Sequence, residues 1–317
     1  MGWAAAGRPA NAEGDNRAMC GIVGLYLKNP ELHGQLGRLF CPMLVEMTER
    51  GPDSAGIAMY HEDQGVGSKV TLYHHNPHFD WDEIAEELQR DLGVEVTVKR
   101  IATHAILSAA DGDTDLRGWV ERNRTDIRIM SSGHTLEIFK EVGLPANVLE
   151  RFGIAGMTGS HAIGHTRMAT ESAVTTEGAH PFNTGDDLCL VHNGSLSNHH
   201  LWRDWLEHNA GIRFQTENDS EVAAAYLTWQ LRQGATLDEA LQACLKDLDG
   251  FFTFAVGTRD GFSVVRDPIA CKHAIMAETD DWVAMSTEYR AIARLPGVEK
   301  ASVWEPKPAT VYSWGRA

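Results

Sequence analysis

The residue with the clearest chemistry stands near the beginning of the sequence, at Cys20, directly after Met19. A thiolate is a strong nucleophile, but a cysteine with an ordinary pKa of about 8.5 is mostly thiol at neutral pH. If Cys20 were the first residue, its own α-amine would lie within reach of the sulfur and could act as general base. The common alternative is a buried strand cysteine, because residues 20–27 form an apolar run.

A cysteine that attacks a carboxamide also needs fixed hydrogen-bond donors for the oxyanion that forms. Asn193 and Gly194 end an apolar strand-like run, so the Asn side-chain amide and the Gly backbone N–H could converge on such an oxygen. An Asn-Gly turn that merely ends a strand is the ordinary alternative. Taken alone, these two stretches favour the ordinary alternatives, and amide hydrolysis by a cysteine depends on the motifs that accompany them.

Four further motifs follow Cys20 in a fixed order along the chain. They are Arg50-Gly51-Pro52-Asp53-Ser54-Ala55-Gly56, Gly164-His165-Thr166-Arg167, His192-Asn193-Gly194 and Asn218-Asp219-Ser220-Glu221. Together with Cys20-Gly21-Ile22-Val23-Gly24 they resemble the class II glutamine amidotransferase domain, an N-terminal-nucleophile hydrolase. The resemblance covers residues 20 to about 295, with one long interruption. It implies an α+β fold, the four-layer αββα sandwich of that class.

The resemblance also implies roles for single residues. Cys20 is the expected nucleophile, and Asn193 with Gly194 the expected oxyanion hole. Arg167 is expected to bind the α-carboxylate of L-glutamine, because a guanidinium matches a carboxylate bidentately, and Asp219 to bind the α-ammonium. A surface salt bridge for Arg167 and a first-turn helix acid for Asp219 are the plainer alternatives. The remaining family-like positions are one further polar substrate contact and three supporting residues: Thr170, Arg50, Asp53 and His180.

Composition narrows the class of protein. The 317 residues carry a formal net charge of −16, which argues against a sequence-independent nucleic-acid binder. No apolar run approaches the length needed to span a membrane. Five widely spaced cysteines without a CxxC pair indicate a reducing compartment, and we expect a cytoplasmic protein. The histidine-rich run at 74–78 lacks a convergent acid or second pair, so we expect an exposed loop and no metal site.

Periodicity predicts the elements that must position these residues. Strands are expected at 20–27, 54–60, 161–170 and 188–192, and hairpins at 251–266 and 274–285. A helix is expected at 30–49, kinked or broken at Pro42, and others at 80–91 and 145–151. Further helices are expected after the N-caps Ser197, Asn218 and Thr236, where Asn218 with Glu221 resembles a capping box.

Two segments fall outside the family pattern. Residues 1–19 lack a basic start and an apolar core, so they do not resemble a secretory signal. We expect them to be a leader that is removed or a misassigned start, and absent from the active protein; retention with a blocked Cys20 is the alternative. Residues from about 74 to 152 are expected to be an inserted α/β segment within the 20–317 amidotransferase domain.

The expected function is a glutaminase half-reaction that releases glutamate and ammonia. No acceptor domain follows the family-like region, so an ammonia-accepting synthase subunit is expected as partner. Chains of this size with such an insertion are similar to the amidotransferase subunits of glutamate-synthase-like assemblies, including N-methylglutamate synthase. That likeness implies no cofactor in this chain, and FMN with iron–sulfur clusters in the partner. Two alternatives are a regulatory subunit with a blocked Cys20 and an amidase for a different amide.

Overall fold

The computed structural model describes residues 20–62, 67–168 and 174–315. Its central element is a seven-stranded antiparallel sheet in which β1 occupies the middle, between β14 and β8. In spatial order this sheet contains β15 (Ser302–Trp304), β13 (Ile275–Glu278), β14 (Trp282–Ser286), β1 (Gly21–Leu27), β8 (His161–Arg167), β2 (Ser54–Tyr60) and β7 (Leu136–Val142).

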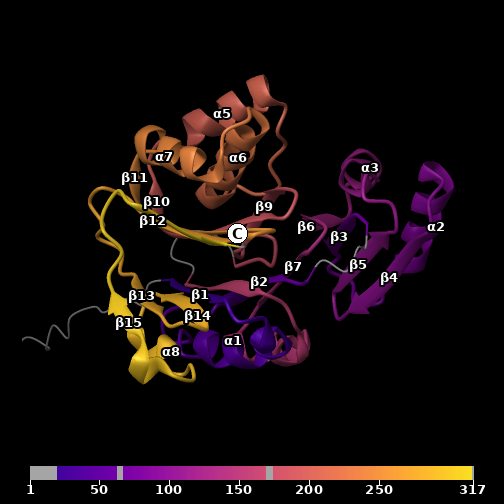
Figure 1. Cartoon of the computed structure of the whole chain (residues 1–317). Coiled ribbons are helices and arrows are strands. Elements are labelled where there is room, and N and C mark those ends of the chain that lie inside the picture. The colour runs from indigo at the N-terminus through magenta and orange to yellow at the C-terminus, as the bar shows by residue number, and fades with distance from the viewer. Residues whose placement is uncertain (1–19, 63–66, 169–173, 316–317) are drawn as a thin grey trace, which may run out of the picture.

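A second, five-stranded sheet packs face to face with the first (Figure 1). In spatial order it contains β16 (Val311–Gly315), β12 (Gly261–Arg266), β11 (Gly250–Thr258), β10 (Leu188–Leu196) and β9 (Phe182–Gly185). Its pairs are antiparallel throughout.

Helices cover the outer face of each sheet and complete four layers (Figure 1). The seven-stranded sheet carries α1 (Leu36–Val45), α4 (Pro145–Arg151), α8 (Tyr289–Ile292) and the short 3-10 helices Pro30–Gln35, Ile154–Gly156 and Val298–Lys300. The five-stranded sheet carries α5 (His199–Ala210), α6 (Asp219–Arg232) and α7 (Leu237–Asp247). The αββα sandwich expected from the sequence is therefore confirmed.

Strand alternation explains why both sheets are buried on both faces. In β1, Val23 and Leu25 point into the helical layer, whereas Ile22 and Tyr26 point toward the other sheet. In β10, Leu190 faces the helices while Val191 faces the opposite sheet. A continuous apolar run is what such a doubly covered strand requires.

A small α/β lobe projects from one side of the sandwich (Figure 1). Its four-stranded sheet contains, in spatial order, β4 (Val96–Ile101), β5 (His104–Ala109), β3 (Lys69–Tyr73) and β6 (Arg128–Gly133). Helices α2 (Trp81–Leu92) and α3 (Leu116–Asn123) pack on it around a separate apolar cluster. The segment expected at 74–152 overlaps this lobe without coinciding with it: β3 begins earlier, and β7 pairs with β2 of the main sheet.

A buried carboxylate fastens the lobe to the sandwich. Asp187, in the turn between β9 and β10, accepts hydrogen bonds at Oδ1 from the backbone N–H groups of Thr135 at 2.8 Å and Leu136 at 2.9 Å. Its Oδ2 accepts another from His134 N at 2.9 Å. Because these three donors form the turn between β6 and β7, one side chain connects the lobe's last strand to the five-stranded sheet.

Three local expectations are corrected by the structure. The helix expected at 30–49 is a 3-10 helix followed by α1, and the chain stays helical through Pro42. Helix α5 begins after Asn198, not Ser197, and the Asn198 side chain bonds to Asp249 N and Asp247 O instead of capping the helix. At α6, Asn218 caps Ser220 N, but Glu221 makes no reciprocal bond to it.

Other expected elements are confirmed. Helix α4 spans the expected residues 145–151, and Thr236 with Glu239 forms a complete capping box at α7. The histidine-rich run at 74–78 is a loop whose residues 75–78 are exposed. Within the described ranges, no helix combines the length and apolar character needed to cross a bilayer.

Candidate active site

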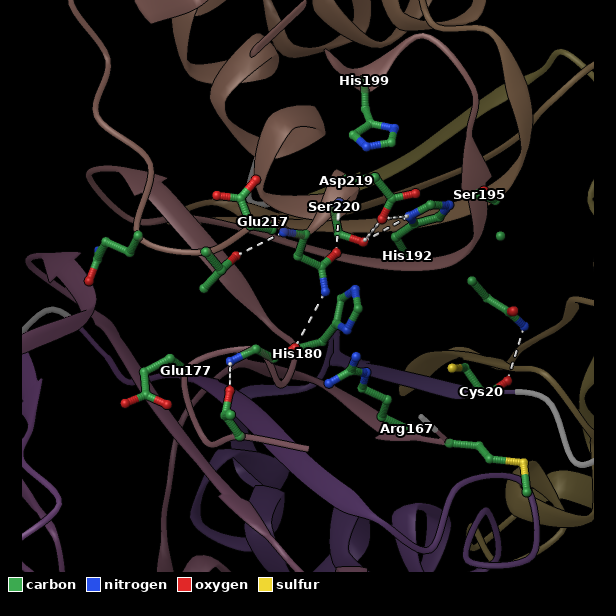
Figure 2. Close-up of a pocket in the computed structure, with 18 of the residues that line it drawn as sticks. Cys20, Arg167, Glu177, His180, His192, Ser195, His199, Glu217, Asp219 and Ser220 are labelled. Atoms are coloured by element: carbon green, nitrogen blue, oxygen red, sulfur yellow. Dashed lines mark hydrogen bonds and ion pairs between the residues drawn. The ribbon is translucent and has the colours of Figure 1, made fainter. Parts of the chain in front are cut away.

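A cavity of about 810 Å³ opens where the two sheets meet, and five residues with expected roles in the chemistry line it. Cys20 directly precedes β1, and Arg167 ends β8 of the same sheet. Asn193 and Gly194 lie on β10 of the opposite sheet, and Asp219 is the first residue of α6. Figure 2 shows Cys20 and Arg167 on one side of the cavity, with Asp219, Ser220 and His192 across from them.

The surroundings of Cys20 act on its thiol in opposite directions. Burial raises the pKa of the Cys20 thiol, because a thiolate is poorly solvated there. The backbone N–H of Met168 and the positive charge of Arg167 oppose this rise. Asn193 contacts the same residue from the other sheet, since its Nδ2 donates to the Cys20 carbonyl at 3.0 Å. Because burial outweighs these opposing effects, a thiolate at Cys20 needs further help to form.

The backbone conformation at position 194 and its close contact with β11 require glycine. Its φ is +153°, and a Cβ at this position would lie 1.9 Å from the carbonyl oxygen of Phe251 on β11. Only glycine allows the chain to approach that strand so closely. Gly194 pairs with Phe252 and Asn193 with Thr253 in the antiparallel register, so the ladder holds both residues in place.

Asp219 belongs to a hydrogen-bonded group rather than standing alone. Its Oδ2 accepts from the backbone N–H of Leu196 at 2.9 Å, and its Oδ1 accepts from Ser220 Oγ at 3.2 Å. His192 Nδ1 lies 2.8 Å from that Ser220 hydroxyl. The Ser220 hydroxyl thereby links the imidazole of His192 to the carboxylate of Asp219.

The turn at residues 50–53 supports Arg167 through the backbone. Asp53 N donates to Arg167 O at 3.1 Å, and a Cβ on Gly51 would lie 2.5 Å from the Arg167 backbone. The Arg50 side chain pairs with Glu288 and does not line the cavity. The Asp53 backbone therefore holds the end of β8, the Arg50 side chain binds Glu288, and neither residue lines the cavity.

Three buried histidines belong to this part of the structure, and two of them, His180 and His192, line the cavity. The ring of His165 on β8 contacts that of His180 in a tilted arrangement, with ring centroids 4.1 Å apart, and both side chains are buried. Burial lowers the pKa of His165 to about 3 and that of His180 well below 6.5. Burial also lowers the pKa of His192, which Asp219 opposes. All three are neutral at physiological pH, so they supply hydrogen-bonding groups and no charge.

The structure adds residues for which no role was predicted from the sequence. His192 and Ser220 were part of recognised motifs, but their bond to Asp219 depends on the packing of α6 against β10. Glu177 and Lys272 line the cavity without any motif around them, and Glu217, which also lines it, directly precedes the motif at 218–221. Thr170 lies outside the described residues. Among the residues that are described, no group of three or more His, Cys, Asp or Glu is arranged to hold a metal ion.

Comparison with known proteins agrees with this fold and arrangement. Residues 165–294 match the family model described as a glutamine amidotransferase domain. The chain is 56% identical over 297 residues to the glutamine amidotransferase-like protein GlxB of Rhizobium meliloti, covering 93% of this chain and 98% of that protein. It is also 32% identical over 134 residues to glutamine–fructose-6-phosphate aminotransferase of Vibrio vulnificus, covering 42% of this chain but only 22% of that enzyme.

Solved structures show the same fold at greater distance. The glutamine phosphoribosylpyrophosphate amidotransferase of B. subtilis superposes with a TM-score of 0.58 at 21% identity, covering 93% of this chain and 49% of that one. The fold and these relatives define a class II glutamine amidotransferase. The chain belongs to that family, whose fold is that of the N-terminal-nucleophile hydrolases.

Proposed function

We propose that this protein hydrolyses L-glutamine to glutamate and ammonia, with Cys20 as nucleophile. The observation that carries the proposal is the single cavity shared by Cys20, Arg167, Asp219 and the Asn193-Gly194 pair. A free amino acid needs a cation for its carboxylate and an anion for its ammonium once both leave water. Arg167, on the same side of the cavity as Cys20, and Asp219, across from them, meet that need (Figure 2).

In the proposed reaction the Cys20 sulfur attacks the side-chain amide carbon of glutamine. A carbon–sulfur bond forms, and the carbonyl π electrons move onto the oxygen, where Asn193 Nδ2 and Gly194 N donate hydrogen bonds. The carbon–nitrogen bond then breaks, and ammonia leaves with the proton taken from the thiol. Water attacks the resulting thioester, releases glutamate and restores the thiol.

The proton carrier in this scheme is the α-amine of Cys20. An amide nitrogen cannot accept a proton, so the scheme requires that no residue precedes Cys20 in the active form. Burial raises the pKa of the thiol, which makes a nearby base more necessary. A protein that begins at Cys20 is expected to be active, and one that retains residues 1–19 is expected to lack turnover.

The first experiment combines intact-mass spectrometry with labelling by a glutamine-like diazoketone. Protein whose mass begins at Cys20 should gain one adduct, excess L-glutamine should prevent it, and glutamate should appear at the rate of ammonia release. The Cys20→Ala variant should lose both adduct and turnover. A protein with a free Cys20 that neither reacts nor turns over glutamine would contradict the proposal and favour a regulatory subunit. Hydrolysis of N-acylated amides in preference to glutamine would instead favour another amidase.

We propose further that a separate synthase subunit receives the ammonia. Free ammonia is protonated and diluted in water, so a chain that makes it benefits from a bound acceptor. A glutamate-synthase-like assembly, such as N-methylglutamate synthase with FMN and iron–sulfur clusters in the partner, is the expected type. Affinity purification from the native host tests this: co-purification of a flavin- and iron-containing subunit supports it, and repeated recovery of this chain alone contradicts it.

A further inference from the structure

Lys272 lines the cavity with Cys20, yet it belongs to no motif. It lies in the turn at residues 267–272, directly after β12 of the five-stranded sheet. Glutamine carries a single carboxylate, and Arg167 is the cation proposed to bind it. A second cation in the same cavity therefore calls for a different role.

Buried charged groups fix the turn that carries Lys272. Asp267 is fully buried, and its Oδ1 accepts from the backbone N–H groups of Ile269 at 2.7 Å and Ala270 at 3.1 Å. The guanidinium of Arg266, also buried, donates from Nη2 to the carbonyl of Lys272 at 2.8 Å. Charge-assisted bonds of this kind hold a backbone in one conformation.

The same turn contains a strained residue. Ala270 has a φ of +53°, in the left-handed region that a residue with a Cβ rarely adopts. Its N–H bonds to Asp267, and its carbonyl accepts from Arg266, so the surroundings keep it in that conformation. Strain that persists in this way is concentrated at sites where position matters for function.

The turn lies against the strand that pairs with the Asn193-Gly194 segment. The Lys272 carbonyl accepts from Thr253 Oγ1 at 3.4 Å, and Thr253 is the ladder partner of Asn193. The Lys272 ammonium lies 5.3 Å from the centre of the Phe251 ring. The backbone of Lys272 is thereby held next to the strand that pairs with the residues proposed to stabilise the oxyanion.

The charge of Lys272 reaches the reacting groups. It acts to lower the pKa of the Cys20 thiol, against the larger effect of burial. It also acts to lower the pKa of His192, which favours the neutral imidazole. A single positive charge that influences groups on both sheets must lie close to the space between them.

We propose that Lys272 is a further residue of this site, and that its ammonium supplies fixed positive charge where sulfur and carbonyl oxygen become negative. This rests on the proposed hydrolysis of glutamine. Lys272 neither gains nor loses a proton in the cycle. It stabilises the thiolate before attack and the oxyanion during it, which is a contribution to the transition state and not to substrate binding.

The test compares Lys272→Met with Lys272→Arg, and uses Lys300→Met as a control at an exposed lysine. Methionine keeps the apolar stem over Phe251 and removes only the charge. The first measurement is the rate of Cys20 alkylation by iodoacetamide as a function of pH, with the modified residue identified by peptide mapping. In Lys272→Met the midpoint should rise by about half a pH unit or more, and the rate at pH 7 should fall about threefold. Lys272→Arg and Lys300→Met should match the wild type.

The second measurement is steady-state glutamine hydrolysis. Lys272→Met should lower kcat about tenfold and leave KM within about twofold, because the lost interaction is made in the transition state. Unchanged alkylation and unchanged kcat would overturn the proposal. A raised KM with normal kcat would also overturn it, since Lys272 would then bind the substrate carboxylate. If the wild type does not hydrolyse glutamine but the alkylation midpoint still shifts, the proposed function fails while the effect of Lys272 on the thiol stands.

Discussion

Lowering the pH from 7 to 5 is expected to destabilise this fold through histidines that are buried in the neutral form. His104 on β5 is fully buried, and its ring packs edge-on against Phe152 with centroids 4.7 Å apart. Burial lowers the pKa of His104 to about 3, and the charge of Lys140 adds to this effect. His165, between the two sheets, also has its pKa lowered to about 3 by burial.

The size of the effect follows from proton linkage. An unfolded histidine titrates near pH 6.5, whereas the folded protein keeps these two rings neutral down to about pH 3. Below pH 6.5 the unfolded chain therefore binds more protons, and the stability present above that pH is progressively lost. Each pH unit costs about 1.4 kcal/mol per histidine, so the fall from 6.5 to 5 removes about 2 kcal/mol for each ring. This pH range, from 6.5 to 5, lies above the range in which ordinary carboxylates titrate.

The assay is urea denaturation followed by tryptophan fluorescence at half-unit steps between pH 7 and 5. His104 and His165 together should account for a loss of about 4 kcal/mol in the unfolding free energy of the wild type, and His180, whose pKa burial also lowers, adds to that loss. In His104→Phe the loss should be smaller by about 2 kcal/mol, whatever the stability of that variant at pH 7. His200→Gln, a change at an exposed histidine, should follow the wild type. Identical pH dependence in wild type and His104→Phe would refute the reasoning.

Three further substitutions test individual contacts. Arg167→Lys should raise KM for glutamine roughly tenfold and change kcat less, because lysine lacks the bidentate fork; steady-state kinetics would contradict this if KM stayed the same. Gly194→Ala should lower the free energy of unfolding by about 2 kcal/mol or more, because its Cβ would lie 1.9 Å from Phe251 O. Gly34→Ala is the control, since its Cβ meets no atom within 4 Å. Equal urea midpoints for the two variants would argue against the close approach. Asp187→Ala should lower the free energy of unfolding by about 3 kcal/mol, because the N–H groups of residues 134–136 would lose their acceptor. An unchanged melting temperature would count against the role of Asp187 in anchoring the lobe.

Elements governed by local rules could be predicted from the sequence. Helix α4 begins at Pro145 because proline suits the first helical turn, and Thr236 with Glu239 caps α7 through bonds that span three residues. The start of α5 could not be found in this way. Asn198 uses its side chain for Asp247 and Asp249, which come from a segment fifty residues later, so no local pattern reveals where that helix begins.

The boundaries of the inserted segment could not be predicted from the sequence for a similar reason. Strands β6 and β7 are neighbours in the sequence, joined by the turn that Asp187 binds, yet β6 completes the lobe and β7 completes the main sheet. Alternation of apolar residues predicts both strands without saying which sheet each one joins. That decision depends on the partners β3 and β2, which are distant in sequence.

Only those residues of the candidate site that lie in a motif could be predicted from the sequence. Cys20, Arg167, Asn193 and Asp219 lie in recognisable runs, and the cavity brings them together. Lys272 has no such run around it. Its place depends on the bond from Arg266 and on the ladder between β10 and β11, which are properties of the folded sheet.

The division of the site between two sheets has a mechanical consequence. One sheet carries Cys20 and Arg167, and the other carries Asn193 and Lys272, so the proposed attack geometry depends on how the sheets sit on each other. The layer between them is a close-packed apolar core that also contains neutral histidines and the buried Lys140, whose Nζ lies 4.6 Å from the centre of the Phe182 ring on the opposite sheet. Such a layer resists sliding because any shift breaks contacts along its whole area. The αββα arrangement thus fixes the hydrogen-bond donors and the nucleophile in position before the substrate arrives.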